Sequence, residues 1–111
     1  MIEVDETYDL LPGIDQQAYG EFVKKEIGRK TPGIVEIRAY RNVLGSPQVR
    51  LTVVWKTLAD WARWVEGAER QAFQSELLKF ATNVKFEIWG PSPVIPEPIR
   101  PARARLEKGL H

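Results

Sequence analysis

The chain has 111 residues, and 43% of them are hydrophobic, which predicts one domain with a single core, because domains are typically about 100–150 residues long. Its formal net charge of +1 argues against a general nucleic-acid-binding protein, since such proteins carry clustered basic residues that neutralise phosphates. It has no cysteine, which excludes disulfides, thiolate nucleophiles and cysteine-ligated metals.

Residues 2–10 alternate between apolar and polar side chains, which predicts a half-buried strand. One side carries Ile2, Val4, Tyr8 and Leu10, and the other carries Glu3, Asp5, Thr7 and Asp9. Leu11-Pro12-Gly13 ends the strand, because proline cannot extend a hydrogen-bonded ladder. The acidic start has no basic region and no long apolar run, so we expect neither a signal peptide nor a membrane span, and a soluble cytoplasmic protein.

A helix is predicted after Asp15, which occupies an N-cap position. Its apolar residues recur at helical spacing and are Tyr19, Phe22, Val23 and Ile27. Gly28 ends the helix, and Thr31-Pro32-Gly33 breaks the chain again.

Two strands joined by a hairpin loop are predicted over residues 34–40 and 48–55. In the first of them, one side carries Val35, Ile37 and Ala39, and the other carries Glu36, Arg38 and Tyr40. The second alternates in the same way, with Arg50, Thr52 and Val54 on the side away from the helices.

Two helical segments and a last strand complete the pattern. Thr57-Leu58-Ala59-Asp60 resembles a capping box and opens a short helix that ends at Gly67, after which a longer helix follows. The apolar positions of these helices are Leu58, Trp61, Ala62 and Val65, then Ala72, Phe73, Leu77 and Phe80. Residues 84–89 form the last strand, with Val84, Phe86 and Ile88 on its apolar side.

This β-α-β-β-α-β order predicts an α+β domain over residues 1–90 with a ferredoxin-like fold. Right-handed crossovers place the helices on one face of a four-stranded antiparallel sheet in the order 4-1-3-2. The composition is poor in Cys, Met and Asn and rich in Arg, Glu and Pro, which fits a thermophilic source, and compositional drift explains it equally well.

The sheet face turned away from the helices indicates a second subunit, because it sets opposite charges on neighbouring strands. Residues 91–111 follow the domain as a Pro-rich arm, which becomes basic at Arg100, Arg103, Arg105 and Lys108. We expect an extended arm that wraps a second copy of the chain in a homodimer. A solvated sheet face and a disordered tail are the alternatives.

Four segments carry a family resemblance, namely Leu11-Pro12-Gly13, Thr31-Pro32-Gly33-Ile34, residues 55–61 and residues 86–90. In this order they resemble the dimeric α/β-barrel superfamily, above all its antibiotic-biosynthesis-monooxygenase-like domains. Glu6-Thr7-Tyr8 before Leu-Pro-Gly is also similar to the related NIPSNAP domains. The resemblance covers about residues 2–90, and it implies a homodimer whose two sheets close into one barrel, with a cleft between sheet and helices in each subunit.

Members of that superfamily include cofactor-independent oxygenases and haem-degrading enzymes. The haem-degrading members use a helix histidine and an asparagine on the first strand. The only histidine here is His111 and the first strand has no asparagine, so we expect no haem. The same shortage excludes histidine-based acid–base and nucleophilic catalysis. We expect no metal and no other cofactor, because the acidic residues of the first strand lie beside basic partners.

The candidate ligand contacts are aromatic residues around the predicted cleft, namely Tyr8, Tyr19, Trp55, Trp64 and Phe73. Trp64 lies off the main apolar stripe of its helix, which favours a pocket rim or an interface. Arg38 and Tyr40 form a second pair on the opposite sheet face. For each ring the alternative is a place in the core, and no catalytic residue is identified.

Two functions remain. The first is a dimeric protein that binds a small hydrophobic or aromatic ligand between sheet and helices, or that binds nothing there. The alternative is a cofactor-independent monooxygenase-like enzyme acting on an aromatic or polyketide-like compound. A cleft filled by Trp55, Trp61 and Phe73 themselves would argue against the enzyme.

Overall fold

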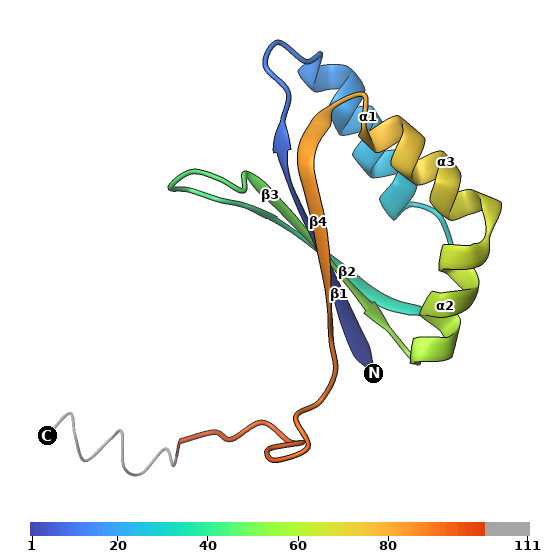
Figure 1. The fold of residues 1–111 in the computed structure, drawn as a ribbon, viewed down its shortest axis with the longest axis vertical. Coiled ribbons are helices and arrows are strands. Elements are labelled where there is room, and N and C mark those ends of the chain that lie inside the picture. The colour runs from blue at the N-terminus through green and yellow to red at the C-terminus, as the bar shows by residue number, and fades with distance from the viewer. Residues whose placement is uncertain (102–111) are drawn as a thin grey trace, which may run out of the picture.

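The computed structural model describes residues 1–101, which form a sheet with helices against one of its faces (Figure 1). The elements in chain order are β1 (Ile2–Leu10), α1 (Gln16–Ile27), β2 (Ile34–Arg41), β3 (Val49–Trp55), α2 (Leu58–Glu66), α3 (Ala68–Leu77) and β4 (Ala81–Trp89). The predicted ferredoxin-like α+β fold is therefore confirmed.

The four strands are antiparallel and lie in the order β2-β3-β1-β4, which is the predicted order. β1 is central and pairs with β3 from Ile2 opposite Trp55 to Tyr8 opposite Val49. On its other side β1 pairs with β4, where Glu6 lies opposite Phe86. Directly opposite residues share a sheet face, so this register decides which side chains meet the helices.

Two bulges alter the predicted alternation at the edge strands. In β2 the register shifts between Ile34 and Glu36, which makes Val35 an extra residue and leaves it 56% exposed. The prediction that Val35 faces the helices is therefore wrong, and Ile34 lies there instead. In β4 the shift lies near Asn83, whose φ of 55° is left-handed, and the strand begins at Ala81 rather than at Val84.

The helix starts are capped as predicted. The Asp15 side chain accepts hydrogen bonds from the backbone N–H groups of Gln17 and Ala18 at 3.0 and 3.1 Å. The hydroxyl of Thr57 accepts from the N–H of Asp60 at 3.1 Å and donates to its carboxylate at 2.8 Å. The start of α2 is thereby fixed beside the end of β3.

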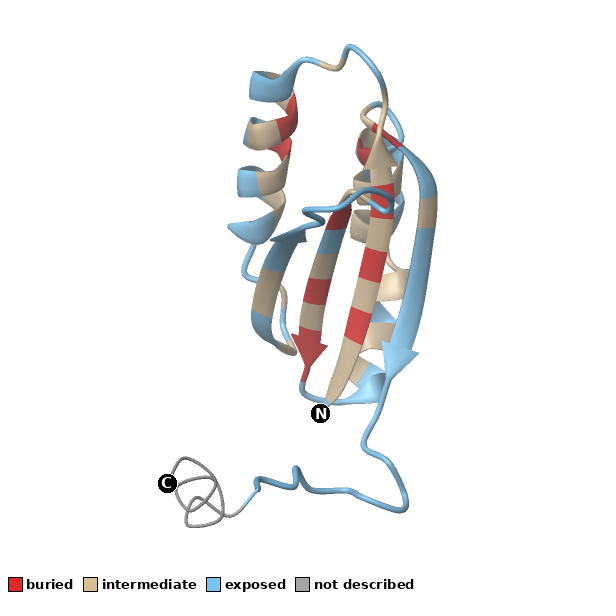
Figure 2. Ribbon diagram, turned by 90° about the vertical axis from the view of Figure 1, so that its left-hand side faces the viewer, coloured by how far each residue is buried: buried red, intermediate tan, exposed pale blue. Residues whose placement is uncertain are grey.

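The main core lies at the α1 and α3 end of the sheet. Its buried residues are Tyr8, Tyr19, Phe22, Val49, Leu77 and Ala81. Figure 2 shows buried positions alternating along the two central strands, whereas most of β2 and β4 is exposed. Three residues predicted on the apolar helix stripes are exposed, namely Ile27, Leu58 and Ala72, so that part of the prediction is wrong.

The arm after β4 leaves the domain (Figure 1). Residues 91–101 are exposed, and the Ser92 hydroxyl accepts from the N–H groups of Val94 and Ile95, both at 3.1 Å. The basic residues Arg103, Arg105 and Lys108 of the predicted arm lie outside the described residues.

Candidate functional site

A small cavity lies between the sheet and the α2–α3 segment, with a volume of about 70 Å³. The residues around it are Val4, Glu6, Ile34, Leu51, Val53, Trp55, Trp61, Trp64, Arg70 and Phe73. Three of the predicted ligand contacts, Trp55, Trp64 and Phe73, therefore meet at one cavity. The sequence predicts this meeting because β3 supplies Trp55 from its helix-facing side and α2 and α3 cover that side.

The aromatic rings pack closely along one wall of the cavity. The ring centres of Trp55 and Trp64 are 5.7 Å apart, and those of Trp64 and Phe73 are 6.3 Å apart. Both pairs are tilted, an arrangement that aromatic rings favour over face-to-face stacking. Trp64 is thus in contact with both neighbours rather than outside the cleft.

Glu6 is the unexpected residue of the cavity. It is only 9% exposed, on the helix-facing side of β1 between Val4 and Tyr8. Sequence reasoning assigned it to neither side of the strand. The signal was nevertheless present, because residues at even positions of β1 share one face and Glu6 breaks an otherwise apolar row. Burial raises the pKa of the Glu6 carboxyl, although the positive charge of Arg70 and a hydrogen bond from Gln74 act in the opposite direction.

Arg70 and Gln74 extend this polar group along α3. The Gln74 amide has two orientations. In the first, its nitrogen faces Glu6 and donates to Oε2 of Glu6 at 3.4 Å. In the second, the amide oxygen and nitrogen are exchanged, and the oxygen accepts from Nη2 and Nε of Arg70 at 2.8 and 3.2 Å. The Arg70 guanidinium also lies over the rings of Trp64 and Phe86, 5.4 and 5.3 Å from their centres. Arg70 therefore contacts the aromatic wall and acts on the carboxyl of Glu6 through its charge.

Two buried polar atoms at the cavity have no hydrogen-bond partner within residues 1–101. They are Oε1 of Glu6 and Nε1 of Trp61. Unpaired buried polar atoms are rare in folded proteins, because each costs free energy when it leaves water. They make this cavity the candidate site.

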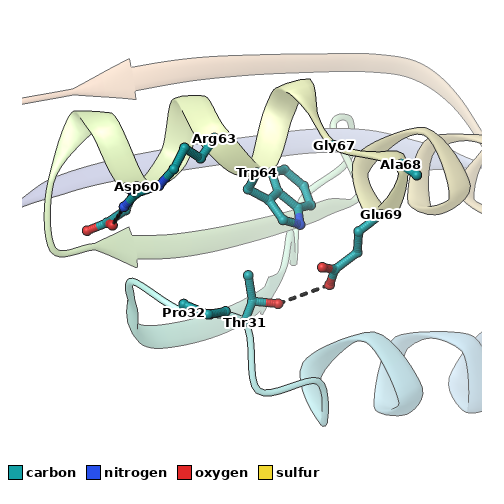
Figure 3. A pocket seen from close by; sticks show the side chains of 8 residues that line it. All are labelled: Thr31, Pro32, Asp60, Arg63, Trp64, Gly67, Ala68 and Glu69. Carbon is teal, nitrogen blue, oxygen red and sulfur yellow. Dashed lines mark hydrogen bonds and ion pairs between the residues drawn. The ribbon is translucent and has the colours of Figure 1, made fainter.

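An open groove of about 330 Å³ adjoins the cavity beside α2. Figure 3 shows it between α2 and the Thr31–Pro32 turn, with the Thr31 hydroxyl donating to Glu69 at 3.0 Å. The Trp64 side chain borders both this groove and the inner cavity. Trp64 is therefore the side chain between the inner cavity and the groove.

The remaining predicted contacts lie elsewhere. Tyr8 and Tyr19 belong to the main core, where their hydroxyl groups bond to each other at 2.6 Å. Burial is the main cause of the raised pKa of Tyr8. Neither tyrosine borders the cavity.

Arg38 and Tyr40 lie on the opposite face of the sheet. Arg38 forms an ion pair with Glu3 at 2.9 Å, and the guanidinium of Arg50 lies 4.6 Å from the centre of the Tyr40 ring. Arg38 therefore takes part in the charge pairing of that face, and Tyr40 takes part in a cation–π contact with Arg50.

Within residues 1–101, no cluster of three metal-ligating side chains is present. Over the same residues, no helix has the length and apolar character that crossing a membrane requires. His111, the only histidine, lies outside the described residues.

Comparisons with known proteins define the fold. No protein-family model matches the chain, and no curated protein matches its sequence. Among solved structures, a candidate antibiotic biosynthesis monooxygenase of Deinococcus radiodurans is similar at a TM-score of 0.71 and 13% identity, over 90% of this chain and 97% of that one.

Two further structures resemble the chain. A variant of SnoaB, a cofactor-independent oxygenase of Streptomyces nogalater, has a TM-score of 0.69 and 11% identity, over 86% of this chain and 97% of that one. A dimeric protein of unknown function with a ferredoxin-like fold, from Bacteroides fragilis, has a TM-score of 0.57 and 11% identity, over 79% and 93%. At such identities the likeness concerns the fold, and the chain thus has the ferredoxin-like fold of antibiotic-biosynthesis-monooxygenase-like proteins.

Proposed function

We propose that the chain binds a small, largely apolar ligand in the cleft between the sheet and α2–α3. The observation that carries this proposal is the buried Glu6 carboxyl beside the aromatic wall. A carboxyl group is costly at such a position, and a leucine there would stabilise the core. A buried group with a raised pKa in a cleft is a typical mark of a binding or catalytic site.

The size of the cavity limits the ligand. Sites for drug-sized molecules measure about 300–1,000 Å³, whereas the inner cavity has about 70 Å³. A polycyclic compound does not fit inside it. A ligand of one ring fits only if its body also occupies the groove beyond Trp64, which adds about 330 Å³.

Methyl NMR with small aromatic fragments tests the location of the site. Val53 borders the cavity, whereas Val54 is its neighbour on the opposite sheet face. Titration with toluene and p-cresol is expected to shift the methyl signals of Leu51 and Val53 and to leave those of Val54 unchanged. Absence of shifts at millimolar fragment, or shifts of Val54 alone, would contradict the proposal.

A cofactor-independent oxygenase is the second candidate function. It is supported by the fold shared with SnoaB and by Glu6, because a carboxylate whose pKa is raised by burial is a stronger proton acceptor than an ordinary glutamate. Oxygen uptake with a hydroxylated aromatic substrate, without added metal or flavin, is then expected to be lost in Glu6→Gln. Uptake that survives this substitution would exclude Glu6 as the base.

We further infer that two cytoplasmic copies of the chain associate through the sheet face away from the helices. Tyr40 and Trp89 are 43% and 54% exposed at the two edges of this face. Large exposed rings of this kind are typical of interfaces. The dimeric Bacteroides fragilis protein of similar fold also supports the inference.

Sedimentation velocity at micromolar concentration tests this association. A species of about twice 12.7 kDa is expected, and Trp89→Glu is expected to give a monomer, whereas Glu21→Lys on the exposed side of α1 is a matched control. Deletion of residues 91–111 is expected to weaken the dimer if the arm clasps the partner. A wild-type monomer would contradict the inference.

A further inference from the structure

The strand β2 has a free edge. It lies at one end of the four-stranded sheet and, within residues 1–101, pairs with β3 alone. Every second residue of such an edge strand turns its N–H and C=O groups outward, where another extended chain can pair with them. The bulge at Val35 interrupts the regular edge, which leaves residues 36–41 for such pairing. This segment is therefore open to a partner strand.

Two hollows follow one another along α1 and β2, and together we call them the α1–β2 groove. The first measures about 330 Å³ and is bordered by Val23 and Ala39. The second measures about 590 Å³ and is bordered by Ile27 and Val35. Ala39 is exposed although it lies on the helix side of the sheet, and Ile27 is 43% exposed although it lies on the apolar stripe of α1. The folded chain thus leaves apolar side chains of this groove uncovered.

Gly20 lies in the middle of α1 and borders the groove. Glycine weakens the interior of a helix relative to alanine. Neither the backbone nor the packing requires it here, because its φ lies outside the left-handed region and a Cβ added to it meets no atom within 4 Å among residues 1–101. The chain alone therefore gives no reason for this glycine, whereas a second chain that approaches the helix backbone closely does.

The rim of the groove is cationic at both ends. Lys24 and Arg41 border the first hollow, and Arg29 and Lys30 border the second. Arg29 pairs with Glu26 at 3.1 Å. Within the described part of the chain, the other three cations form no ion pair. This uncompensated charge favours an acidic partner.

We propose that the α1–β2 groove binds an extended peptide of another protein, with an apolar middle and acidic ends, as a strand added to residues 36–41. Pairing with the edge of β2 aligns the peptide, and its side chains on the helix side fill the groove beside Gly20. Its acidic ends reach Lys24 and Arg41 at one end and Lys30 at the other. This surface is separate from the cleft at α2–α3.

The Pro-rich arm of a second copy fits this groove poorly. Pro93, Pro96 and Pro98 have no N–H to donate to a ladder, and the arm becomes basic at Arg100. A basic segment would meet a cationic rim. The groove is therefore assigned to a different protein.

NMR titration of the full chain with two synthetic peptides tests the charge requirement. The first peptide alternates valine and threonine between two glutamates at each end, and the second has lysine in place of every glutamate. The acidic peptide is expected to shift the amide signals of β2, to protect them from hydrogen exchange and to bind at least about tenfold more tightly than the basic one. Equal affinities, shifts confined to β4 or to the α2–α3 cleft, or no binding at millimolar peptide would overturn the inference. Binding of a single-stranded oligonucleotide at β2 in preference to the acidic peptide would overturn it as well.

N-methylation of the acidic peptide tests strand addition. Alternate residues of an added strand face β2, and the others face solvent. Methylating the backbone nitrogens of one alternate set is expected to abolish binding, and methylating the other set is expected to preserve it. Two methylated peptides that both bind as well as the parent would overturn the inference.

Substitutions at the rim locate the charge contact. Lys24→Glu is expected to weaken binding of the acidic peptide by about tenfold. Lys25→Glu makes the same change at the next position of α1, which borders neither hollow, and is expected to weaken it by less than about threefold. Equal losses in the two variants would overturn the inference.

Gly20→Leu tests the groove itself. It is expected to weaken binding at least about tenfold without lowering the thermal midpoint, because leucine favours a helix and has free space at this position. Unchanged affinity in the folded variant would overturn the inference. Deletion of residues 91–111 is expected to leave the affinity unchanged, and a higher affinity would mean that the arm occupies the groove and would overturn it too.

Discussion

The hydroxyl groups of Tyr8 and Tyr19 lie 2.6 Å apart in the core, and each is the buried partner of the other. Their rings meet edge to face with centres 6.4 Å apart. β1 and α1 are therefore joined by a polar contact inside an apolar layer. Because each hydroxyl already has a partner, this pair stabilises the domain and does not present a polar group to a ligand.

The first prediction concerns this pair. Tyr8→Phe or Tyr19→Phe leaves one buried hydroxyl unpaired, so each single substitution is expected to lower the free energy of unfolding by about 1–3 kcal/mol. The double substitution removes both hydroxyls, and its cost is expected to be clearly smaller than the sum of the single costs. Urea denaturation of the four proteins measures this coupling.

Additive costs would contradict the pairing of the two hydroxyls. Binding of p-cresol supplies a second control, since neither tyrosine borders the cavity. Its affinity is expected to stay within about threefold of the wild-type value in both single variants, because the cleft residues are unchanged.

The second prediction concerns the turn that supports α2. Gly33 has φ +92°, and a Cβ added there would lie 2.5 Å from Cβ of Asp60, whereas Gly13 has φ +73° and no atom within 4 Å. Gly13→Ala is expected to cost about 1 kcal/mol for its backbone conformation. Gly33→Ala is expected to cost at least about 1 kcal/mol more, because Asp60 must also move. Equal losses on urea denaturation would show that the contact with Asp60 is unimportant.

The third prediction concerns Asp9, which holds the hairpin loop. Its carboxylate accepts from the Ser46 hydroxyl at 2.7 and 2.8 Å, from the N–H of Gln48 at 3.0 Å and from the Asn83 amide at 3.1 Å. Hydrogen bonds from Ser46 and Asn83 are the main reasons why the pKa of Asp9 is lowered. Asp9→Ala is therefore expected to lower the thermal midpoint, and by more than Ser46→Ala does.

The effect of Asp9 is also expected to depend on pH. A lowered pKa stabilises the folded protein above the ordinary aspartate value of 3.8, and this contribution disappears as the pH falls through the folded-state pKa. The difference in thermal midpoint between wild type and Asp9→Ala is thus expected to shrink at low pH. A constant difference from pH 7 to pH 2 would argue against ionised Asp9 as the anchor.

The fold could be predicted because period-two alternation, caps and turns agreed along most of the chain. The prediction failed where one extra residue entered a strand, as at Val35, because a bulge leaves no clear mark in an apolar run. At the site, Trp55 and Phe73 could be predicted from their size and periodicity, and Trp64 from its size and its place off the apolar stripe of its helix. Glu6 was missed because a carboxyl group on a buried face contradicts the apolar pattern, and such local contradictions are expected at functional positions.

The last prediction concerns the stability cost of Glu6. Burial raises the pKa of Glu6 above the ordinary value of 4.5. Over the pH range between this ordinary value and the higher folded-state pKa, the folded protein therefore binds more protons than the unfolded chain. Stability contributed by this residue therefore falls as the pH rises through that range.

Glu6→Gln removes the ionisation and is expected to raise the free energy of unfolding at pH 7 by on the order of 1 kcal/mol. The gain is expected to vanish near pH 4, where Glu6 is largely neutral in both states. Glu21→Gln, on an exposed face of α1, is expected to change stability by less than about 0.5 kcal/mol at either pH. Urea denaturation at both pH values measures these differences, and a gain at pH 4 as large as that at pH 7 would mean that Glu6 destabilises the fold through its shape rather than its charge.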